Sequence, residues 1–161
     1  VENVALPILQ TPSTAGEPTA ADGFIPLPFP PSYPSGVAEW VKFVPQAIYW
    51  GLRLLHERYG YDKLYITENG TVGADELVNG RIIDTDRVQY YRLYLQSALR
   101  AVAEGLPLRG FFAWSMMDNF EWSEGYHHRF GIIHVDFETL KRTPKLSAAF
   151  YRECIRARTV L

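Results

Sequence analysis

Residues 63–70 read KLYITENG, an apolar run that ends on an acid and a turn. Its first five residues include the aromatic Tyr65 and the β-branched Ile66 and Thr67, which are typical of a strand. Glu68 follows this run directly, and Asn69-Gly70 then turns the chain. A carboxylate at a strand end is held by rigid backbone and can be aimed at a ligand. The spacing alone leaves two roles open for Glu68, a functional acid or a cap of the next turn.

Helical patterns and further strands surround this run. Residues 45–59 and 85–104 are predicted helices, the second opened by Asp84 or Thr85 and closed by Gly105. Its expected buried face consists of Val88, Tyr91, Leu95, Leu99 and Val102. Further expected elements are a strand at 109–115, a short strand or hairpin arm at 132–137, and a last helix from Pro144 to about Arg156.

The order helix, strand, helix, strand, helix predicts an α/β fold with a parallel sheet. In such sheets the chemistry lies beyond the carboxyl ends of the strands. Glu68 and the segment that follows residues 109–115 are therefore expected at the site. Two core strands are too few to form a stable parallel sheet alone, so the chain is expected to be part of a larger fold.

The first 36 residues differ from the rest, because they hold eight of the eleven prolines. Proline fixes φ and removes a backbone donor, so a long irregular segment is predicted here. A segment of this kind is either a surface arm or linker, or a functional loop.

Composition excludes several classes of protein. A formal net charge of -2 provides no basic field for a nucleic-acid backbone. No apolar run approaches the roughly 20 residues that span a bilayer. The first ten residues lack the pattern of a signal peptide, which favours a cytoplasmic location. The single cysteine, Cys154, cannot form an internal disulfide.

Residues 111–131 interleave carboxylates with aromatic rings in a pattern that suits sugar binding. Trp114 is expected to end the second strand, and Asp118, Asn119, Glu121, Trp122 and Glu124 follow it. Polar groups of this kind take sugar hydroxyls, and flat rings pack on the pyranose face. Core tryptophans beside a solvated acidic loop are the alternative. Residue chemistry alone would pair Glu68 with Glu121 as the two carboxylates of glycoside cleavage.

Three strings together resemble one family. They are YITENG at 65–70, FAWSMMDNFEWSEGYHHRFGIIHVDF at 112–137 and KRTPKLSAAFYREC at 141–154. They are similar to the C-terminal part of glycoside hydrolase family 1, the retaining β-glucosidase-like enzymes. The resemblance runs from about Trp40 to Arg156, and it implies a TIM (β/α)8 barrel. Residues 1–161 would then be the C-terminal part of a single barrel domain. Residues 1–36 would form a long loop, and residues 37–161 would hold the preceding helix and roughly the last two βα units.

The resemblance implies a role for each candidate residue. Glu68 would be the nucleophile that forms the glycosyl-enzyme intermediate. Trp114 and Phe130 would line the sugar subsite, and Glu121 and Trp122 would bind the outer hydroxyls. Glu121 is thereby a recognition residue, which replaces the pairing with Glu68 given above. The family requires no metal or organic cofactor.

The resemblance also implies that one catalytic group lies elsewhere. The family's acid/base is the Glu of an Asn-Glu-Pro string, and the chain holds only Gly16-Glu17-Pro18, which is not a substitute. The expected partners are a β-glucoside or short β-linked oligosaccharide and the N-terminal portion of the barrel, in the same or a separate chain. Because Glu121 would repel a phosphate, an unphosphorylated glucosyl residue is expected, with galactose and fucose left open.

Other readings remain beside this one. A non-catalytic barrel remnant that binds sugar or a partner is the alternative function. Asn69-Gly70-Thr71 matches a glycosylation sequon, and His127-His128 is a pair that could hint at a metal. Neither is predicted to be a functional site, and Asp75, Glu76 and Arg81 are expected to be solvated.

Overall fold

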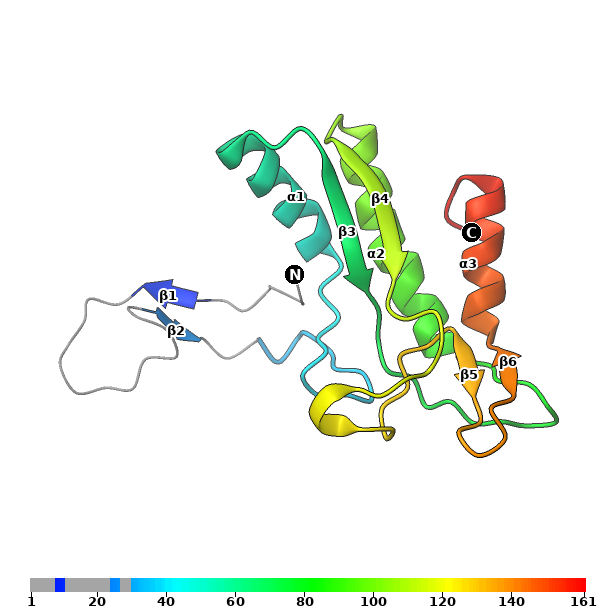
Figure 1. Ribbon diagram of the computed structural model, residues 1–161. Coiled ribbons are helices and arrows are strands. Elements are labelled where there is room, and N and C mark those ends of the chain that lie inside the picture. Colours follow the sequence, from blue (N-terminus) through cyan, green and yellow to red (C-terminus); the bar gives the residue numbers. More distant parts are fainter. Residues whose placement is uncertain (1–7, 11–23, 27–29) are drawn as a thin grey trace, which may run out of the picture.

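A parallel pair of strands forms the centre of the chain. The computed structural model describes residues 8–10, 24–26 and 30–161. Strand β3 (Leu64–Asn69) pairs with β4 (Leu108–Ala113) from Leu64↔Leu108 to Asn69↔Ala113. Both carboxyl ends therefore meet at one edge, as the alternation of helices and strands predicts (Figure 1). The helices predicted at 45–59 and 85–104 are present, each within one residue of the predicted range.

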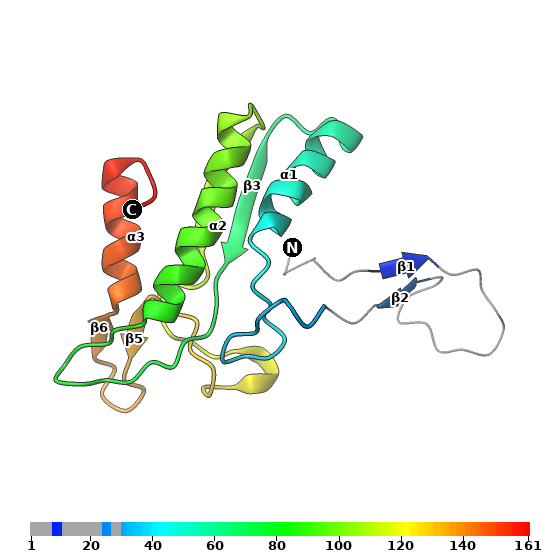
Figure 2. The ribbon, with the colours of Figure 1, turned by 180° about the vertical axis from the view of Figure 1, so that it is seen from behind.

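Three helices line up against this pair. They are α1 (Gln46–Tyr59), α2 (Thr85–Ala103) and α3 (Leu146–Ala157). Seen from behind, α2 lies in front of the strands, with α1 on one side and α3 on the other (Figure 2). Gly60 ends α1 at a φ of 71°, a left-handed conformation that glycine adopts without a Cβ penalty. None of the helices in the described ranges is long and apolar enough to cross a membrane.

Two antiparallel pairs and one short helix complete the described elements. Strand β5 (Ile133–Val135) pairs with β6 (Arg142–Pro144), which confirms a hairpin arm at 132–137. Pro144 ends β6, so α3 begins two residues later than predicted. Strands β1 (Ile8–Gln10) and β2 (Phe24–Pro26) also pair, so the first 36 residues are not irregular throughout. The other positions before residue 30 lie outside the described residues.

The buried face of α2 differs from the predicted one. Its apolar and aromatic buried residues are Tyr90, Tyr91, Tyr94, Ala98 and Ala101, whereas Leu99 and Val102 are 43% and 46% exposed. The small alanines let neighbouring elements approach closely. The Tyr94 hydroxyl accepts from the Val44 N–H at 3.0 Å and donates to the Lys42 carbonyl at 3.1 Å. Tyrosine rings thus occupy much of this face in place of aliphatic residues, and the hydroxyls of Tyr91 and Tyr94 find polar partners there.

The core has two parts, and one of them underlies the strand ends. That part consists of Ala38, Val41, Val72, Tyr90, Tyr91, Tyr94 and Phe130. These residues come from the segment before α1, the loop after β3, α2 and the loop after β4. The second part, Tyr49, Leu52, Leu64, Ala101 and Leu106, lies between α1, α2 and β3. The loops at the carboxyl edge therefore rest on a packed base.

Candidate active site

Glu68 and Trp114 leave adjacent strands at the same edge of the sheet. Glu68 is the last residue but one of β3 and is exposed. The Trp114 N–H donates to the Asn69 carbonyl at 2.8 Å, so the two strand ends stay paired up to that point. Trp114 packs half-buried against the core beneath. The structure thus brings together two residues that are 46 positions apart in the sequence.

Gly70 makes this close approach possible. A Cβ built on Gly70 would lie 1.6 Å from the Trp114 carbonyl oxygen, far inside any allowed contact. The Tyr91 hydroxyl donates to the same carbonyl at 3.3 Å, and the Trp114-Ser115 peptide bond is cis. Asn69 and Thr71 on either side are 6% and 1% exposed. Their burial removes the sequon from the accessible surface.

A hollow of about 530 Å³ opens between the loop after β4 and the segment before α1. It is lined by Trp40, Glu121, Trp122, Ser123 and Glu124. Trp122 begins the short 3-10 helix η1 (Trp122–Glu124), and its side chain is 81% exposed. The two segments lie side by side below the strand tips in Figure 1. Glu121 and Trp122 therefore line one site, together with Glu124 and with Trp40, an aromatic residue that the sequence motif did not identify.

His128 supports the rim of this hollow. Its ring meets the Trp40 ring edge-on with centroids 5.0 Å apart, and its Nε2 lies 3.4 Å from Glu124 Oε2. His127 is exposed. Among residues 8–10, 24–26 and 30–161, no three potential metal ligands cluster together.

Phe130 lies in the core rather than along the hollow. Its side chain is 8% exposed and belongs to the cluster beneath the strand ends. Its carbonyl accepts from the Ser115 N–H at 3.1 Å, which places it directly beside the residue after Trp114. Phe130 and Trp114 pack on the same cluster, while Glu121 and Trp122 lie on the hollow.

Sequence patterns missed a buried ionic network behind these loops. It contains three carboxylates, Asp75, Asp84 and Asp118, and three cations, Arg87, Arg129 and Lys145. All but Arg129 have side chains no more than 1% exposed. The numbers of opposite charges match, as burial in a medium of low polarity requires.

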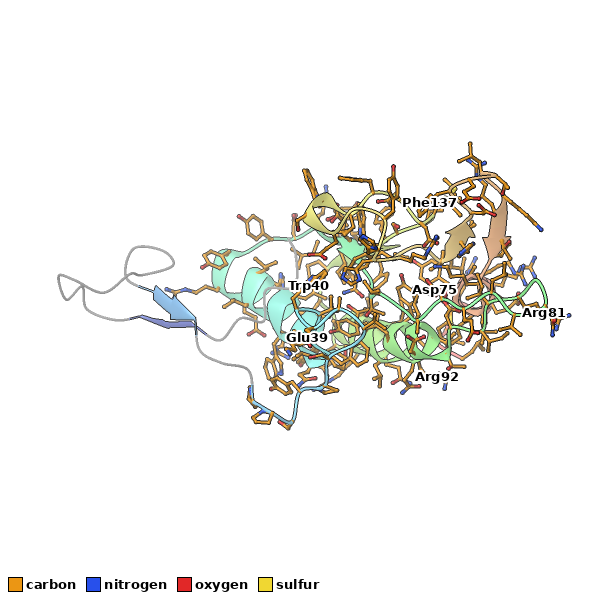
Figure 3. The ribbon with its side chains drawn as sticks, turned by 90° about the horizontal axis from the view of Figure 1, so that it is seen from below. Glu39, Trp40, Asp75, Arg81, Arg92 and Phe137 are labelled. Atoms are coloured by element: carbon orange, nitrogen blue, oxygen red, sulfur yellow. The ribbon has the colours of Figure 1, made fainter. Side chains whose placement is uncertain are left out.

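Asp75 is the clearest correction to the sequence analysis. Its carboxylate is buried and accepts from Arg87 Nη1 at 2.7 Å and from Lys145 Nζ at 2.5 Å. Figure 3 shows Asp75 inside this end of the molecule, whereas Arg81 projects from the tip of its loop. Glu76 and Arg81 are exposed, as expected. Chain position alone could not separate Asp75 from these neighbours, because its partners come from α2 and the start of α3.

Arg87 is the most enclosed member of the network. Burial opposes its charge, but hydrogen bonds and the charges of Asp75 and Asp84 outweigh burial and raise its pKa above the ordinary value. Its guanidinium donates to the Thr71 carbonyl at 3.2 Å and to the Arg129 carbonyl at 2.8 Å. Asp118, a candidate sugar ligand by sequence, is likewise buried and paired with Lys145 and Arg129.

Comparison with known proteins agrees with this arrangement. The profile of Glycosyl hydrolase family 1 matches residues 10–160. Beta-glucosidase A of Thermotoga maritima is 44% identical over 117 residues, which are 71% of this chain and 26% of that protein. Beta-glucosidase 1 of Oryza sativa subsp. japonica is 38% identical over 130 residues, 80% of this chain and 25% of that protein. A 6-phospho-beta-galactosidase of Streptococcus equi subsp. zooepidemicus is 41% identical over 123 residues, 76% of this chain and 26% of that protein.

Solved structures match as well. The family 1 b-glucosidase from Thermotoga maritima superposes with a TM-score of 0.80 at 37% identity, over 87% of this chain and 32% of that one. The same enzyme in complex with glucoimidazole gives a TM-score of 0.80 at 37% identity, over 86% and 31%. The chain thus spans about a quarter of its curated relatives and about a third of these solved chains. By profile, sequence identity and fold, the chain belongs to glycosyl hydrolase family 1 and forms part of an α/β TIM barrel.

Proposed function

We propose that this chain supplies the nucleophile and the glycone-binding residues of a retaining β-glycosidase. The substrate class is terminal, unphosphorylated β-D-glucosyl residues of β-glucosides or short β-linked oligosaccharides. The observation that carries the proposal is the placement of Glu68 and Trp114 on adjacent strand ends, joined by the Trp114 N–H to Asn69 carbonyl bond of 2.8 Å. A carboxylate beside an indole, at the carboxyl edge of parallel strands, is suited to attack on a bound sugar.

Glu68 is the proposed nucleophile. It attacks the anomeric carbon and forms a covalent glycosyl-enzyme intermediate, which water then hydrolyses. Its exposure at the strand end leaves the carboxylate open to a substrate. In a retaining enzyme the acid/base carboxyl lies about 5–5.5 Å from the nucleophile. That group is proposed to come from the remaining portion of the barrel, because these 161 residues contain no Asn-Glu-Pro string.

The hollow is proposed to hold the sugar's outer hydroxyls. Trp122 and Trp40 offer flat apolar faces, and Glu121 and Glu124 offer acceptors for hydroxyl groups. Trp114 and Phe130, which pack in the core cluster beneath the strand ends and do not line the hollow, are proposed to form the inner wall of the sugar subsite. Among the described residues, two carboxylates and no lysine or arginine line the hollow, which disfavours a phosphorylated sugar. The 6-phospho-beta-galactosidase among the relatives makes this specificity a point to test.

The test combines this chain with the remaining barrel portion, either as one polypeptide or as two fragments. The assembled protein should hydrolyse 4-nitrophenyl β-D-glucoside, and the first-formed sugar seen by NMR should be the β-anomer. Glu68→Gln should lower kcat by roughly a thousandfold or more, since it removes the attacking group. Glu76→Gln, which changes an exposed carboxylate of the following loop, is the matched control and should retain full activity.

Different results point to different errors. Full activity in Glu68→Gln would refute the nucleophile assignment. A first-formed α-anomer would refute the retaining mechanism. Faster cleavage of the 6-phosphoglucoside than of the glucoside would refute the proposed glycone. Sugar binding without any turnover by the assembled protein would favour a non-catalytic binding role.

A further inference from the structure

Asp118 lies at the base of the loop that carries Glu121 and Trp122. It is three positions before Glu121, and its side chain is completely buried. Oδ1 accepts from the Gly131 N–H at 3.0 Å and from Lys145 Nζ at 2.8 Å. Oδ2 accepts from Arg129 Nη1 at 2.7 Å and from the Val135 N–H at 3.3 Å. Both oxygens are thus surrounded by donors.

These contacts hold together the two ends of the loop that carries Glu121 and Trp122. Asp118 lies where the chain enters the loop, and Arg129, Gly131 and Val135 lie where it returns. The Asp118 N–H also donates to the Ile133 carbonyl at 3.0 Å. A Cβ on Gly131 would lie 2.1 Å from the Asp118 nitrogen, so entry and exit are in direct contact. Residues 119–128, with the hollow, project beyond this closure.

The same carboxylate links this loop to the one after β3. Lys145 Nζ bridges Asp118 and Asp75, at 2.8 Å and 2.5 Å. Arg87 then joins Asp75 to the Thr71 carbonyl, three residues beyond Glu68. An unbroken chain of polar contacts therefore runs from the base of the Trp122 loop through Asp75, which is labelled in Figure 3, to the loop beyond Glu68.

We infer that Asp118 is a positioning residue, which holds the loop of Glu121 and Trp122 in place for sugar recognition. This inference rests on the proposed function of that loop. Asp118 touches no substrate and acts through the loop it closes. An ionised carboxylate is the group that fits, because it accepts at both oxygens and carries the charge that Lys145 and Arg129 balance.

Asp118→Asn is the substitution that changes the contacts at the base of this loop with the least change in side-chain size. It keeps the size of the side chain but replaces one acceptor oxygen by an NH2 group that faces two donors. Ser147→Ala is the matched control. It removes the 2.5 Å bond from Ser147 Oγ to Asp84 Oδ2, which is also buried in the network but is not one of the Asp118 contacts. Both variants are expected to lose stability, so stability alone does not decide the question.

Two readouts separate positioning from a purely structural role. The first is discrimination between 4-nitrophenyl β-D-glucoside and the β-D-xyloside, which lacks the hydroxymethyl group, measured as kcat/KM in the assembled barrel. Asp118→Asn should lower this ratio about tenfold or more, mainly by slowing the glucoside, because the displaced loop loses contacts to the outer hydroxyls. Ser147→Ala should leave the ratio unchanged.

The second readout is amide hydrogen exchange of residues 119–128 in the same samples, which needs no activity. Exchange should accelerate about tenfold or more in Asp118→Asn and stay at the wild-type rate in Ser147→Ala. Should Asp118→Asn fail to fold, Arg129→Gln removes one of the four donors at a partly exposed position and should give a smaller change in the same direction.

The outcomes keep the two proposals apart. An unchanged sugar ratio and unchanged loop exchange in Asp118→Asn or Arg129→Gln would overturn the positioning role, whatever the stability of the variant. Absence of hydrolysis by the wild-type assembled barrel would instead contradict the proposed function, and loop exchange would still decide whether Asp118 holds the loop.

Discussion

Lys145→Met removes one charge from the centre of the buried network. The Lys145 side chain is completely buried, and its Nζ lies 2.5 Å from Asp75 and 2.8 Å from Asp118. Methionine fills a similar volume and keeps the apolar packing of the lysine stem. The change therefore isolates the charge. Three carboxylates then face two cations, so the buried network carries one excess negative charge, even though each carboxylate keeps one arginine partner.

The expected cost is large. Breaking a buried ion pair by removing one partner destabilises a protein by about 3–5 kcal/mol, because the remaining charge stays desolvated. That is a large part of the roughly 5–15 kcal/mol that stabilises a typical domain. With a urea m-value of about 2 kcal/mol per molar, the unfolding midpoint should fall by about 1.5–2.5 M.

Urea unfolding followed by circular dichroism measures this shift. Lys63→Met makes the same substitution at an exposed position just before β3 and should leave the midpoint unchanged. A midpoint for Lys145→Met within about 0.5 M of wild type would refute the reasoning. It would mean that water reaches the network or that the carboxylates separate at little cost.

Two further predictions concern packing and pH. Gly70→Ala should lower the free energy of unfolding by at least about 3 kcal/mol, because the new Cβ would overlap the Trp114 carbonyl. At Gly51 in α1 a Cβ meets nothing within 4 Å, so Gly51→Ala should raise the free energy of unfolding by about 0.5–1 kcal/mol. Thermal unfolding of both variants measures the difference. Burial raises the pKa of the Tyr90 and Tyr91 hydroxyls above the unfolded value of about 10. The stability they provide is therefore complete below pH 10 and should fall above it by about 1.4 kcal/mol per pH unit for each tyrosine, with tyrosinate absorbance rising only on unfolding.

The strand ends were predictable because their signals are local. The sequence shows an apolar run followed by Glu68 and a second run predicted to end at Trp114. The alternation of helices and strands and the rule for parallel sheets suffice to place both residues. Parallel pairing then places both residues at one edge, as the Asn69↔Ala113 register shows. Residue spacing could not assign different roles to Glu68 and Glu121, because a catalytic glutamate and a sugar-binding glutamate look alike in sequence. The resemblance to the family motifs supplied the roles predicted for them.

The buried charges were not predictable in the same way. Asp75 and Glu76 are neighbours in a polar loop, yet one is enclosed by Arg87 and Lys145 and the other is exposed. The partners of Asp75 lie 12 and 70 positions away. Contacts at such separations depend on how α2 and α3 pack, and periodicity within one element carries no information about them.

The sequence by itself determined the order of helices and strands and the positions of Glu68 and Trp114 at strand ends, because both follow from local patterns. It also determined membership in a barrel family, because the three motifs match that family residue by residue. Tertiary structure alone decided which acids are buried, which face of α2 packs inward, and that Trp40 joins Glu121 and Trp122 around one hollow. The physical reason is that burial is a property of surroundings. A side chain is desolvated only when segments distant in the chain close over it.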